Sequence, residues 1–350
     1  MAKKKEVLEE DKGKSKFELA MEKLNKNYGK GTILALDSKT TGDYDVISTG
    51  SIGFDYVTLG VGGVVKGKMY EFMGWEGTGK STICGHLVAN CQEKGGVAVY
   101  IDGEHAVDKK YFQALGVDTT KMFIAQPASG EEGFQIAEDM IKSGEVDLII
   151  IDSDSSLIPK SAIVDGDVGE STIGKKARLN SNAYPRLKNS LVSNKTCVVV
   201  ISQYREKIGM MFGNPTTTQG GHALKFYSDV RVEISKTLAK EGDQAYGNIT
   251  KIKATKNKMS PPYRASQFEI VYGKGIDKLT EIVELGLEFG ILEKYGKSTT
   301  YKTIKYETAD FKILLQDNPE LFDELKQTIV NSIQTTELED INLLTSEEKD

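Results

Sequence analysis

A glycine-rich segment is the feature of this chain that most constrains its fold. Residues 74–81 read Gly-Trp-Glu-Gly-Thr-Gly-Lys-Ser, an unbroken match to the phosphate-binding pattern G-x-x-x-x-G-K-[ST]. Apolar residues precede the motif at 69–73, and residues 82–92 after it are compatible with a helix. A strand that enters a glycine-rich turn and continues as a helix is the context that this motif requires.

The residue types in this segment suit a nucleoside triphosphate. Glycines let backbone N–H groups surround an anion, and the N-terminus of the next helix adds a partial positive charge. We expect Lys80 to reach the β- and γ-phosphates and the Ser81 hydroxyl to hold Mg²⁺. The residues predicted to bind nucleotide here are Gly74, Trp75, Glu76, Gly77, Thr78, Gly79, Lys80, Ser81 and Thr82.

Composition sets the broad class of protein. A length of 350 residues suggests two or three domains, because domains average about 150 residues. The 39% hydrophobic and 27% charged content is typical of a soluble globular protein. The sequence has no apolar run of about 18 residues and no signal core, so we expect a cytoplasmic protein with no membrane partner. Three cysteines without C-x-x-C spacing also indicate a reducing compartment.

The net charge of −6 is unevenly distributed along the chain. Residues 337–350 carry six acidic side chains and one lysine, a local charge of −5, so the other 336 residues sum to −1. The body of the protein is therefore nearly neutral and can hold local basic surfaces. Its overall acidity does not exclude DNA as a partner.

The middle of the chain has the pattern of an α/β core. Near-continuous apolar runs at 97–101, 148–151 and 197–201 suit strands that are buried on both faces of a mostly parallel sheet. The segments between them are long enough for crossover helices. We therefore predict an α/β fold built around a phosphate-loop ATPase core.

The ends of the chain differ from this core. Phe17, Met21 and Leu24 have helical spacing, which predicts a helix over 16–28. That helix either packs on its own domain or serves as an arm that reaches a neighbouring subunit. Helical patterns at 279–289, 308–316 and 319–332 predict a small C-terminal domain, for which we expect an α+β fold. The predicted divisions are an N-terminal tail and helix (1–45), the core (46–275), the C-terminal domain (276–335) and an acidic tail (336–350).

Two acidic positions follow predicted core strands. Asp152 ends the apolar run 148–151, where a carboxylate beside the phosphate loop can hold the Mg²⁺ shell together with Ser81. Glu104 follows the strand 97–101, at the edge of the sheet where ligands bind. The residues alone leave Glu104 open between activating a water molecule and a capping or solvated role.

Gln203 begins a segment of unusual composition. Residues 204–221 combine basic and apolar side chains with glycines and three threonines, and they show no pattern of regular structure. Such a long irregular segment inside a compact core is usually functional, and this composition suits a loop that binds nucleic acid. The alternative is a flap that folds over the core.

The same segment resembles a known family. Gly-Met-Met-Phe-Gly-Asn-Pro at 209–215, the glycines at 220–221 and Ala-Leu-Lys-Phe-Tyr at 223–227 are similar to the bacterial RecA recombinases. Further matching segments are 47–51, 101–106, 256–258 and 273–276. The similarity runs from about residue 17 to residue 332, in order and with nearly intact spacing, and it fits a cellular, phage or mobile-element member.

This resemblance implies a RecA-type fold and a function. The family's members are DNA-dependent ATPases that use ATP and Mg²⁺, form filaments on single-stranded DNA and exchange strands with a homologous duplex. Implied partners are single-stranded and duplex DNA, further copies of the chain, and single-strand-binding and mediator proteins. In this family the N-terminal helix docks on the adjacent protomer, which favours the arm interpretation of residues 16–28.

The resemblance also assigns roles around the nucleotide. Glu104 matches the catalytic glutamate that activates the attacking water, alongside Lys80. Gln203 matches a glutamine that senses the γ-phosphate and relays the presence of this phosphate to the adjacent DNA loop. Asp108 and Tyr111 match the residues that bracket the adenine.

Other matching residues lie farther from the phosphate loop. Lys256 and Lys258 match lysines that reach the neighbouring subunit's ATP, although the residues alone favour a solvated strand end. The family binds DNA through two loops, here at about 165–173 and 204–219. The residues at or near DNA-contacting positions are Arg178, Ser181, Arg186, Arg205, Lys207, Gly220 and Gly221.

Several positions depart from the family pattern. Trp75 lies in the phosphate loop where the family usually has proline or another residue, and we expect little loss because its backbone still contributes. Lys175 and Lys176 replace small apolar residues and are expected to add positive charge near the first DNA loop. Pro185 can kink its helix near a DNA-contacting position, so Arg186 is the candidate for that contact after a one-residue shift.

Two rival functions use a similar ATPase core. One is a ring-forming helicase or packaging motor, and the other is an ATP-responsive scaffold related to clock-type ATPases. The DNA loop at 209–221 argues against both rivals.

Overall fold

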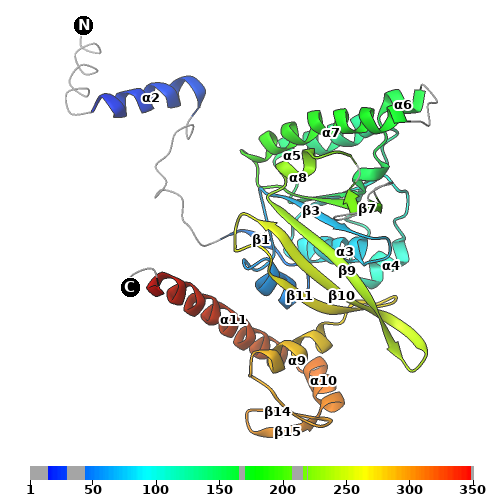
Figure 1. The fold of residues 1–350 in the computed structure, drawn as a ribbon, viewed down its shortest axis with the longest axis vertical. Coiled ribbons are helices and arrows are strands. Elements are labelled where there is room, and N and C mark those ends of the chain that lie inside the picture. Colours follow the sequence, from blue (N-terminus) through cyan, green and yellow to red (C-terminus); the bar gives the residue numbers. More distant parts are fainter. Residues whose placement is uncertain (1–14, 30–43, 165–169, 207–215, 219, 348–350) are drawn as a thin grey trace. The chain divides into compact units, whose positions relative to one another are not determined.

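The computed structural model describes residues 15–29, 44–164, 170–206, 216–218 and 220–347. The chain divides into two compact units, Met1–Tyr44 and Asp45–Asp350. Within the first unit, α2 spans Lys16–Tyr28 (Figure 1). Ser15 caps α2 by accepting a hydrogen bond from the backbone of Glu18, whose carboxylate accepts one from the backbone of Ser15. No residue of α2 is buried, so its apolar stripe is left without a covering surface.

A ten-stranded sheet forms the centre of the second unit. The strand order is β12-β11-β10-β9-β3-β7-β6-β4-β5, and β8 pairs with β7. Pairs from β9 through β5 are parallel, and β9 to β12 form antiparallel pairs. The strands are β3 (Met69–Gly74), β4 (Ala98–Asp102), β5 (Phe123–Ala125), β6 (Leu148–Asp152), β7 (Cys197–Glu206), β8 (Thr216–Thr218), β9 (Val230–Glu241), β10 (Gln244–Asn257), β11 (Ala265–Val271) and β12 (Gly275–Ile276). The predicted α/β fold with a mostly parallel central sheet is confirmed.

Helices cover both faces of this sheet (Figure 1). Alternate residues of each parallel strand face opposite sides, so Tyr100 packs in the core layer that contains α3, and Ile101 packs in the layer that contains α5 and α7. The helices of the core are η2 (Gly53–Thr58, a π-helix), α3 (Lys80–Glu93), α4 (Lys109–Ala114), α5 (Gly130–Ser143), η3 (Asp154–Ser156, a 3₁₀-helix), α6 (Lys160–Val164), α7 (Glu170–Leu191) and α8 (Ala223–Tyr227). A separate two-stranded sheet pairs β1 (Val46–Ile47) with β2 (Val64–Val65).

The end of the chain forms a small α+β cluster. Its elements are α9 (Lys278–Glu288), β13 (Glu293–Tyr295), β14 (Ser298–Tyr301), β15 (Ile304–Glu307), α10 (Thr308–Asp317) and α11 (Pro319–Glu347). Phe311 and Leu325 are fully buried in its own apolar core. Glu281 of α9 joins this cluster to η2, because its carboxylate accepts hydrogen bonds from the Ser51 hydroxyl and from the backbone of Gly53.

The base of the predicted DNA loop at 204–221 is more regular than the sequence suggested. Strand β7 continues to Glu206, and β8 pairs with it antiparallel, with Tyr204 opposite Thr218 and Arg205 opposite Thr217. β-Branched threonines favour such strand pairing. Residues 207–215 and 219, which include the predicted DNA contact Lys207, lie outside the described residues.

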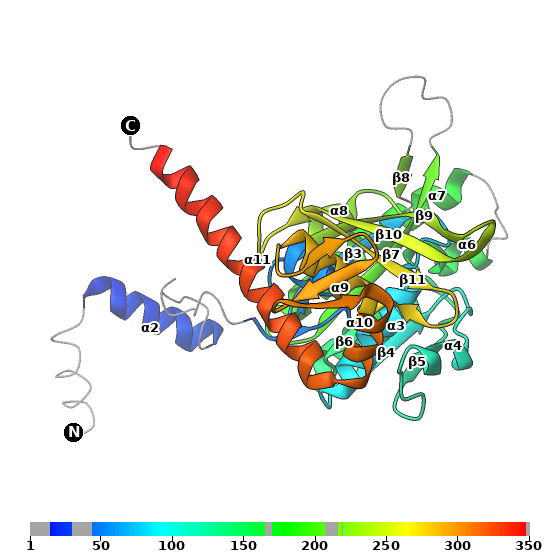
Figure 2. The same cartoon turned by 90° about the horizontal axis from the view of Figure 1, so that it is seen from below.

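Helix α7 begins inside the first predicted DNA loop. It begins at Glu170, so residues 170–173 of the first predicted DNA loop are helical, while 165–169 lie outside the described residues. The helix also continues through Pro185 to Leu191. Figures 1 and 2 show α6, α7 and β7 on the same side of the core, so the two predicted DNA segments border one surface.

Candidate functional site

The phosphate loop connects the end of β3 to the start of α3. Gly79, the residue before α3, has a φ of +93°. A β-carbon on Gly79 would lie 2.5 Å from the Ile270 side chain, and one on Gly74 would lie 2.2 Å from the backbone oxygen of Ile234. Gly79 therefore requires glycine because of its positive φ, and Gly74 requires it because a β-carbon would collide with the backbone of β9.

Lys80 lies inside this loop. Its ammonium donates hydrogen bonds to the backbone oxygens of Gly74 at 3.0 Å and Trp75 at 2.7 Å. Burial lowers the pKa of Lys80, while the nearby charges of Asp152 and Glu104 act in the opposite direction. The loop thus holds a buried cation among backbone groups at the start of a helix.

Asp152 ends β6 beside the phosphate loop. Its Oδ2 accepts hydrogen bonds from the Ser81 hydroxyl at 2.7 Å and the Tyr100 hydroxyl at 2.6 Å. Burial raises the pKa of Asp152, and these two hydrogen bonds partly oppose the shift. The structure therefore brings together the predicted pair Ser81 and Asp152. No motif in the sequence indicates Tyr100, which faces Asp152 from the neighbouring strand β4.

Glu104 follows β4 at the same edge of the sheet. Its Oε1 accepts hydrogen bonds from the Ser153 hydroxyl at 2.6 Å and from Nε2 of Gln203 at 2.8 Å. Strands β4, β6 and β7 are parallel and lie side by side in this order, so Glu104 after β4 and Ser153 after β6 meet Gln203, which lies inside β7. Glu104 thus lies between two donors, of which Ser153 was not expected from the sequence.

These residues surround one pocket of 280 Å³. Its lining residues are Glu76, Gly77, Thr78, Gly79, Lys80, Ser81, Thr82, Glu104, Tyr111, Asp152, Ile201, Gln203, Asn248, Ile270 and Tyr272. Asn248 and Tyr272 come from β10 and the turn after β11, and the Tyr272 hydroxyl donates to Oδ1 of Asn248 at 3.2 Å. The sequence missed both residues because the antiparallel part of the sheet carries no motif that refers to the phosphate loop.

The two predicted adenine-binding residues sit differently relative to this pocket. Tyr111 lines it, and its hydroxyl is hydrogen bonded to the Thr82 hydroxyl at 2.7 Å. Asp108 does not line the pocket. It caps α4 by accepting a hydrogen bond from the Tyr111 backbone at 2.7 Å, so it fixes the turn that carries Tyr111.

Lys256 and Lys258 do not line their own chain's pocket. Lys256 donates to the backbone oxygens of Lys225 and Phe226 at the end of α8, at 3.0 and 3.1 Å. Lys258 forms an ion pair of 3.2 Å with Asp229, whose carboxylate also accepts a hydrogen bond from the backbone of Met69. Met69 begins β3 and the phosphate loop follows its end, so Lys258 and the loop lie at opposite ends of this strand.

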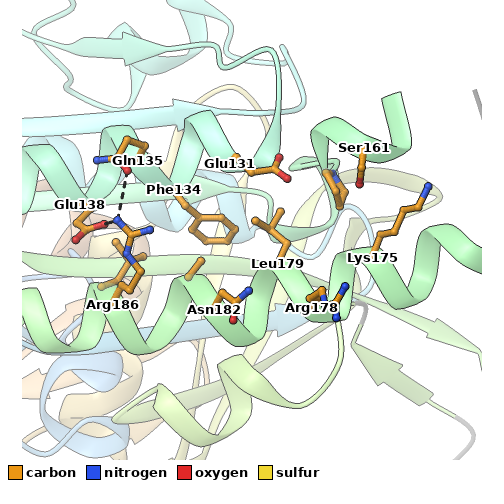
Figure 3. A pocket seen from close by; sticks show the side chains of 13 residues that line it. Glu131, Phe134, Gln135, Glu138, Ser161, Lys175, Arg178, Leu179, Asn182 and Arg186 are labelled. Atoms are coloured by element: carbon orange, nitrogen blue, oxygen red, sulfur yellow. Dashed lines mark hydrogen bonds and ion pairs between the residues drawn. The ribbon is translucent and has the colours of Figure 1, made fainter. Parts of the chain in front are cut away.

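The predicted DNA contacts on α7 lie on an exposed side of the core. Arg178 and Ser181 are exposed, and Arg178 lines a second pocket, of 570 Å³, between α5 and α7 (Figure 3). Arg186 lines the same pocket and reaches from α7 to the carboxylate of Glu138 on α5. It is therefore engaged in an ion pair within the chain, although it remains 59% exposed.

The other predicted DNA contacts border the hairpin of β7 and β8. Arg205 is exposed on β7. Gly220 and Gly221 both have positive φ values, +89° and +80°. These glycines let the chain turn from β8 towards α8.

Lys176 corrects an expectation about charge on this surface. The side chain is buried, and its ammonium donates to the backbone oxygen of Leu157 at 2.7 Å and lies 3.6 Å from the carboxylate of Asp154. Lys176 therefore adds no positive charge to the DNA-facing side. The Lys176 side chain is buried because it pairs with the buried carboxylate of Asp154, 22 positions earlier in the sequence.

The fold and the pocket define a class of protein. A parallel sheet, a phosphate loop after its central strand and an acidic residue at the end of a strand two places away are the elements of a phosphate-loop nucleotide-binding protein. Within the described part of the chain, no helix is long and apolar enough to cross a membrane.

Comparison with known proteins defines the family. A family model described as "RecA N-terminal domain" matches residues 15–277. The chain is 44% identical to Protein RecA of Cytophaga hutchinsonii over 322 residues, which cover 91% of this chain and 90% of that protein. It is 43% identical to Protein RecA of Campylobacter lari and of Aquifex aeolicus, over 93% and 90% of this chain and 95% and 92% of those proteins. The chain belongs to the RecA family. It is a DNA-dependent ATPase and a recombinase that acts in DNA recombination and repair.

Proposed function

We propose that the 280 Å³ pocket hydrolyses ATP with Mg²⁺, and that ATP binding drives filament formation on single-stranded DNA and strand exchange with a homologous duplex. The observation that carries this proposal is the position of Glu104. One of its carboxylate oxygens is held by Ser153 and Gln203, in the same pocket as Lys80. A candidate base, a phosphate-binding cation and a residue that leads into the DNA hairpin therefore meet at one site.

Lys80 and the loop backbone would bind the phosphates. The ammonium of Lys80 now bonds two backbone oxygens, which are weaker partners than phosphate oxygens. Because burial disfavours its charge, a triphosphate would compensate this cation well. Such compensation stabilises both bound ATP and the charge that develops during phosphoryl transfer.

Ser81 and Asp152 fit the requirements of Mg²⁺. Both offer oxygen atoms, and Mg²⁺ is commonly held by one or two protein groups together with phosphate oxygens and water. Burial raises the pKa of Asp152, so a cation next to this carboxylate would offset an electrostatic cost that the structure carries. When bound, the ion supplies positive charge that neutralises the phosphates.

Glu104 is placed to accept a proton from the attacking water. Its Oε2 does not take part in the bonds to Ser153 and Gln203, which both reach Oε1. Gln203 is followed directly by Tyr204 at the base of the β7–β8 hairpin. A change at the γ-phosphate that moves Gln203 would therefore move the start of the proposed DNA-binding segment.

The base of the nucleotide would lie near α4. Tyr111 lines the pocket and is tied to Thr82 of α3, so its ring is available to pack on adenine. Asp108, which caps α4, would bracket the adenine from the adjacent position. These two roles follow the family pattern.

We assign Lys256 and Lys258 to the nucleotide of a neighbouring subunit. Lys258 lies at the beginning of β3 and the phosphate loop at its end, so about 17 Å of strand separates them. A lysine side chain cannot span this distance within one chain. A filament would bring the two lysines of one subunit to the pocket of the next.

DNA would bind along the side of the core that carries α7 and the hairpin. Arg178, Ser181 and Arg205 are exposed there and can contact the phosphate backbone. Gly220, Gly221 and Lys207 complete this set, as the family pattern assigns them. For Arg186, DNA contact would compete with its ion pair to Glu138.

Two exposed apolar surfaces favour the proposal that copies of the chain assemble with one another. Strand β5 is an edge of the sheet and exposes Phe123 and Ile124. Helix α2 exposes Phe17 and Tyr28 and buries no residue. Unpaired edges and uncovered apolar stripes are typical of surfaces that another chain covers. We further propose a cytoplasmic location, and single-strand-binding and mediator proteins as additional partners.

Electron microscopy tests this function. The protein is imaged with single-stranded DNA and a non-hydrolysable ATP analogue, and we expect extended filaments that require both ligands. Lys80→Ala should abolish their ATP dependence, whereas the exposed control Lys195→Ala should assemble like the parent. Closed rings, or filaments that are indifferent to nucleotide, would contradict the proposal.

A further inference from the structure

A buried carboxylate outside the nucleotide pocket connects two regions of the proposed DNA-binding surface. Asp154 lies in η3, directly after Ser153, and is 1% exposed. Its carboxylate accepts hydrogen bonds from the Tyr184 hydroxyl and from Nδ2 of Asn180, both on α7. Lys176, one turn earlier on α7, supplies a compensating charge at 3.6 Å.

Asn180 carries this connection to the end of the hairpin. Its Nδ2 lies 3.1 Å from both carboxylate oxygens of Asp154 and also donates to the backbone oxygen of Gly220 at 3.0 Å. A β-carbon on Gly220 would lie 2.2 Å from this Nδ2 and 2.6 Å from Oδ2 of Asp154. The backbone at Gly220 is therefore packed directly against the Asp154–Asn180 pair.

The buried polar groups of this cluster carry a free-energy cost, and packing alone does not explain why they are present. Among the described residues Oδ1 of the buried Asn180 has no hydrogen-bond partner, a defect that typically costs about 1–3 kcal/mol. A buried ion pair such as Lys176–Asp154 is also often no more stabilising than apolar residues of similar size. A polar cluster retained at such a cost suits a role in fixing the positions of the segments that it joins.

The other end of the connection reaches the catalytic pocket. Ser153, adjacent to Asp154, donates its hydroxyl to the Glu104 carboxylate at 2.6 Å. The same carboxylate oxygen is bound by Gln203, on the strand that begins the hairpin. Glu104 is thus joined to the start of the hairpin through Gln203, and to its end through Ser153, Asp154, Asn180 and Gly220.

We propose that Asn180 is a positioning residue that couples DNA at the hairpin to ATP hydrolysis at Glu104, by holding Gly220 against the Asp154 carboxylate. DNA that shifts the end of the hairpin then shifts Asp154, and with it the Ser153 hydroxyl that orients Glu104. This route is separate from the one through Gln203. The inference rests on the proposed function, since it takes Glu104 as the base and the hairpin as a DNA site.

The test is the DNA dependence of hydrolysis in Asn180→Leu. Leucine has the same branching and the same number of side-chain heavy atoms as asparagine but cannot donate to Asp154 or Gly220. We expect the ratio of hydrolysis with single-stranded DNA to hydrolysis without it to fall at least about fivefold. The KM for ATP and the rate without DNA should stay within about twofold of the parent. Asn189→Leu, at an exposed asparagine on the same helix and outside the pocket of Arg178, is the matched control and should keep the parent's ratio.

A second variant covers the case in which Asn180→Leu does not fold, as judged by its thermal unfolding. Asn180→Ala removes the same donor with a smaller side chain, and the ratio should fall in the same way. A ratio within about twofold of the parent in a folded variant, at saturating DNA, overturns the inference. A fall in the ratio that comes only from weaker DNA binding, or a loss of both rates together, also overturns it. If the parent itself shows no stimulation by DNA, the proposed function fails instead.

Discussion

The indole ring of Trp75 packs edge-on against the ring of Tyr204, with 6.0 Å between their centroids and an interplanar angle of 70°. Trp75 belongs to the phosphate loop, and Tyr204 is paired with Thr218 at the base of the hairpin. The contact therefore joins the nucleotide site to the proposed DNA segment. The contact depends on the side chain of Trp75, whereas the expectation of little loss at this position rests on its backbone alone.

Trp75 is the only tryptophan of the chain, so its fluorescence reports on this contact. We predict that nucleotide and single-stranded DNA each change its emission, because both ligands bind beside one of the two rings. Tyr204→Leu should remove most of the change caused by DNA while it keeps the change caused by nucleotide. Tyr204→Phe retains the ring and should behave like the parent. If Tyr204→Leu responds to DNA as the parent does, the contact does not join the two sites.

Lys256 and Lys258 should act on the neighbouring subunit. Replacing both with alanine is expected to reduce DNA-stimulated hydrolysis by at least about tenfold, with little effect on nucleotide binding by an isolated subunit. Mixing this variant with Lys80→Ala should restore part of the activity, because an intact phosphate loop can then face intact lysines.

A mixture of Lys80→Ala with Glu104→Gln is the matched control for this experiment. Both residues line the same pocket of one chain, so no interface in this mixture has a complete site and activity should stay low. Co-assembly of the mixed subunits is checked by cross-linking. Equal activity in the two mixtures would refute a site shared between subunits.

Glu281 should make stability depend on pH. Burial raises its pKa from 4.5 to about 7, although hydrogen bonds from Ser51, Gly53 and Ile52 oppose the shift. Between these pH values the unfolded chain loses a proton that the folded chain keeps. The free energy of unfolding should therefore fall as pH rises from 4.5 to 7, by about 3 kcal/mol from this group.

Denaturant unfolding across this pH range measures the effect. Glu281→Gln should remove this component of the slope, whereas Glu288→Gln, an exposed position on the same helix, should keep it. The buried Asp55, whose pKa is raised to about 6, contributes a slope of the same sign at lower pH in all three proteins. Parallel curves for the parent and Glu281→Gln would show that Glu281 titrates normally.

The features that could be predicted from the sequence are those that local patterns of residues encode. The phosphate loop, Asp152 and the helix at 16–28 are encoded by residues that are close together, and the structure places them as expected. The resemblance added the roles of Glu104 and Gln203, which the structure brings to one pocket.

The contacts that were missed join distant parts of the chain. Lys176 is buried because Asp154 faces it from another element, and nothing near Lys176 in the sequence indicates this partner. Asn248 lines the nucleotide pocket only because β10 lies two strands away from β3 in the sheet. Such contacts depend on tertiary packing, which a single sequence does not display.

ATP hydrolysis by Glu104→Gln is the most direct test of the central claim, that this pocket hydrolyses ATP with Glu104 as the base. The substitution removes the basic carboxylate and leaves the phosphate loop unchanged. We predict that turnover with single-stranded DNA falls by about two orders of magnitude or more, while the binding of ATP and of DNA stays close to that of the parent. Turnover within about twofold of the parent, in a variant that binds both ligands, would contradict the account.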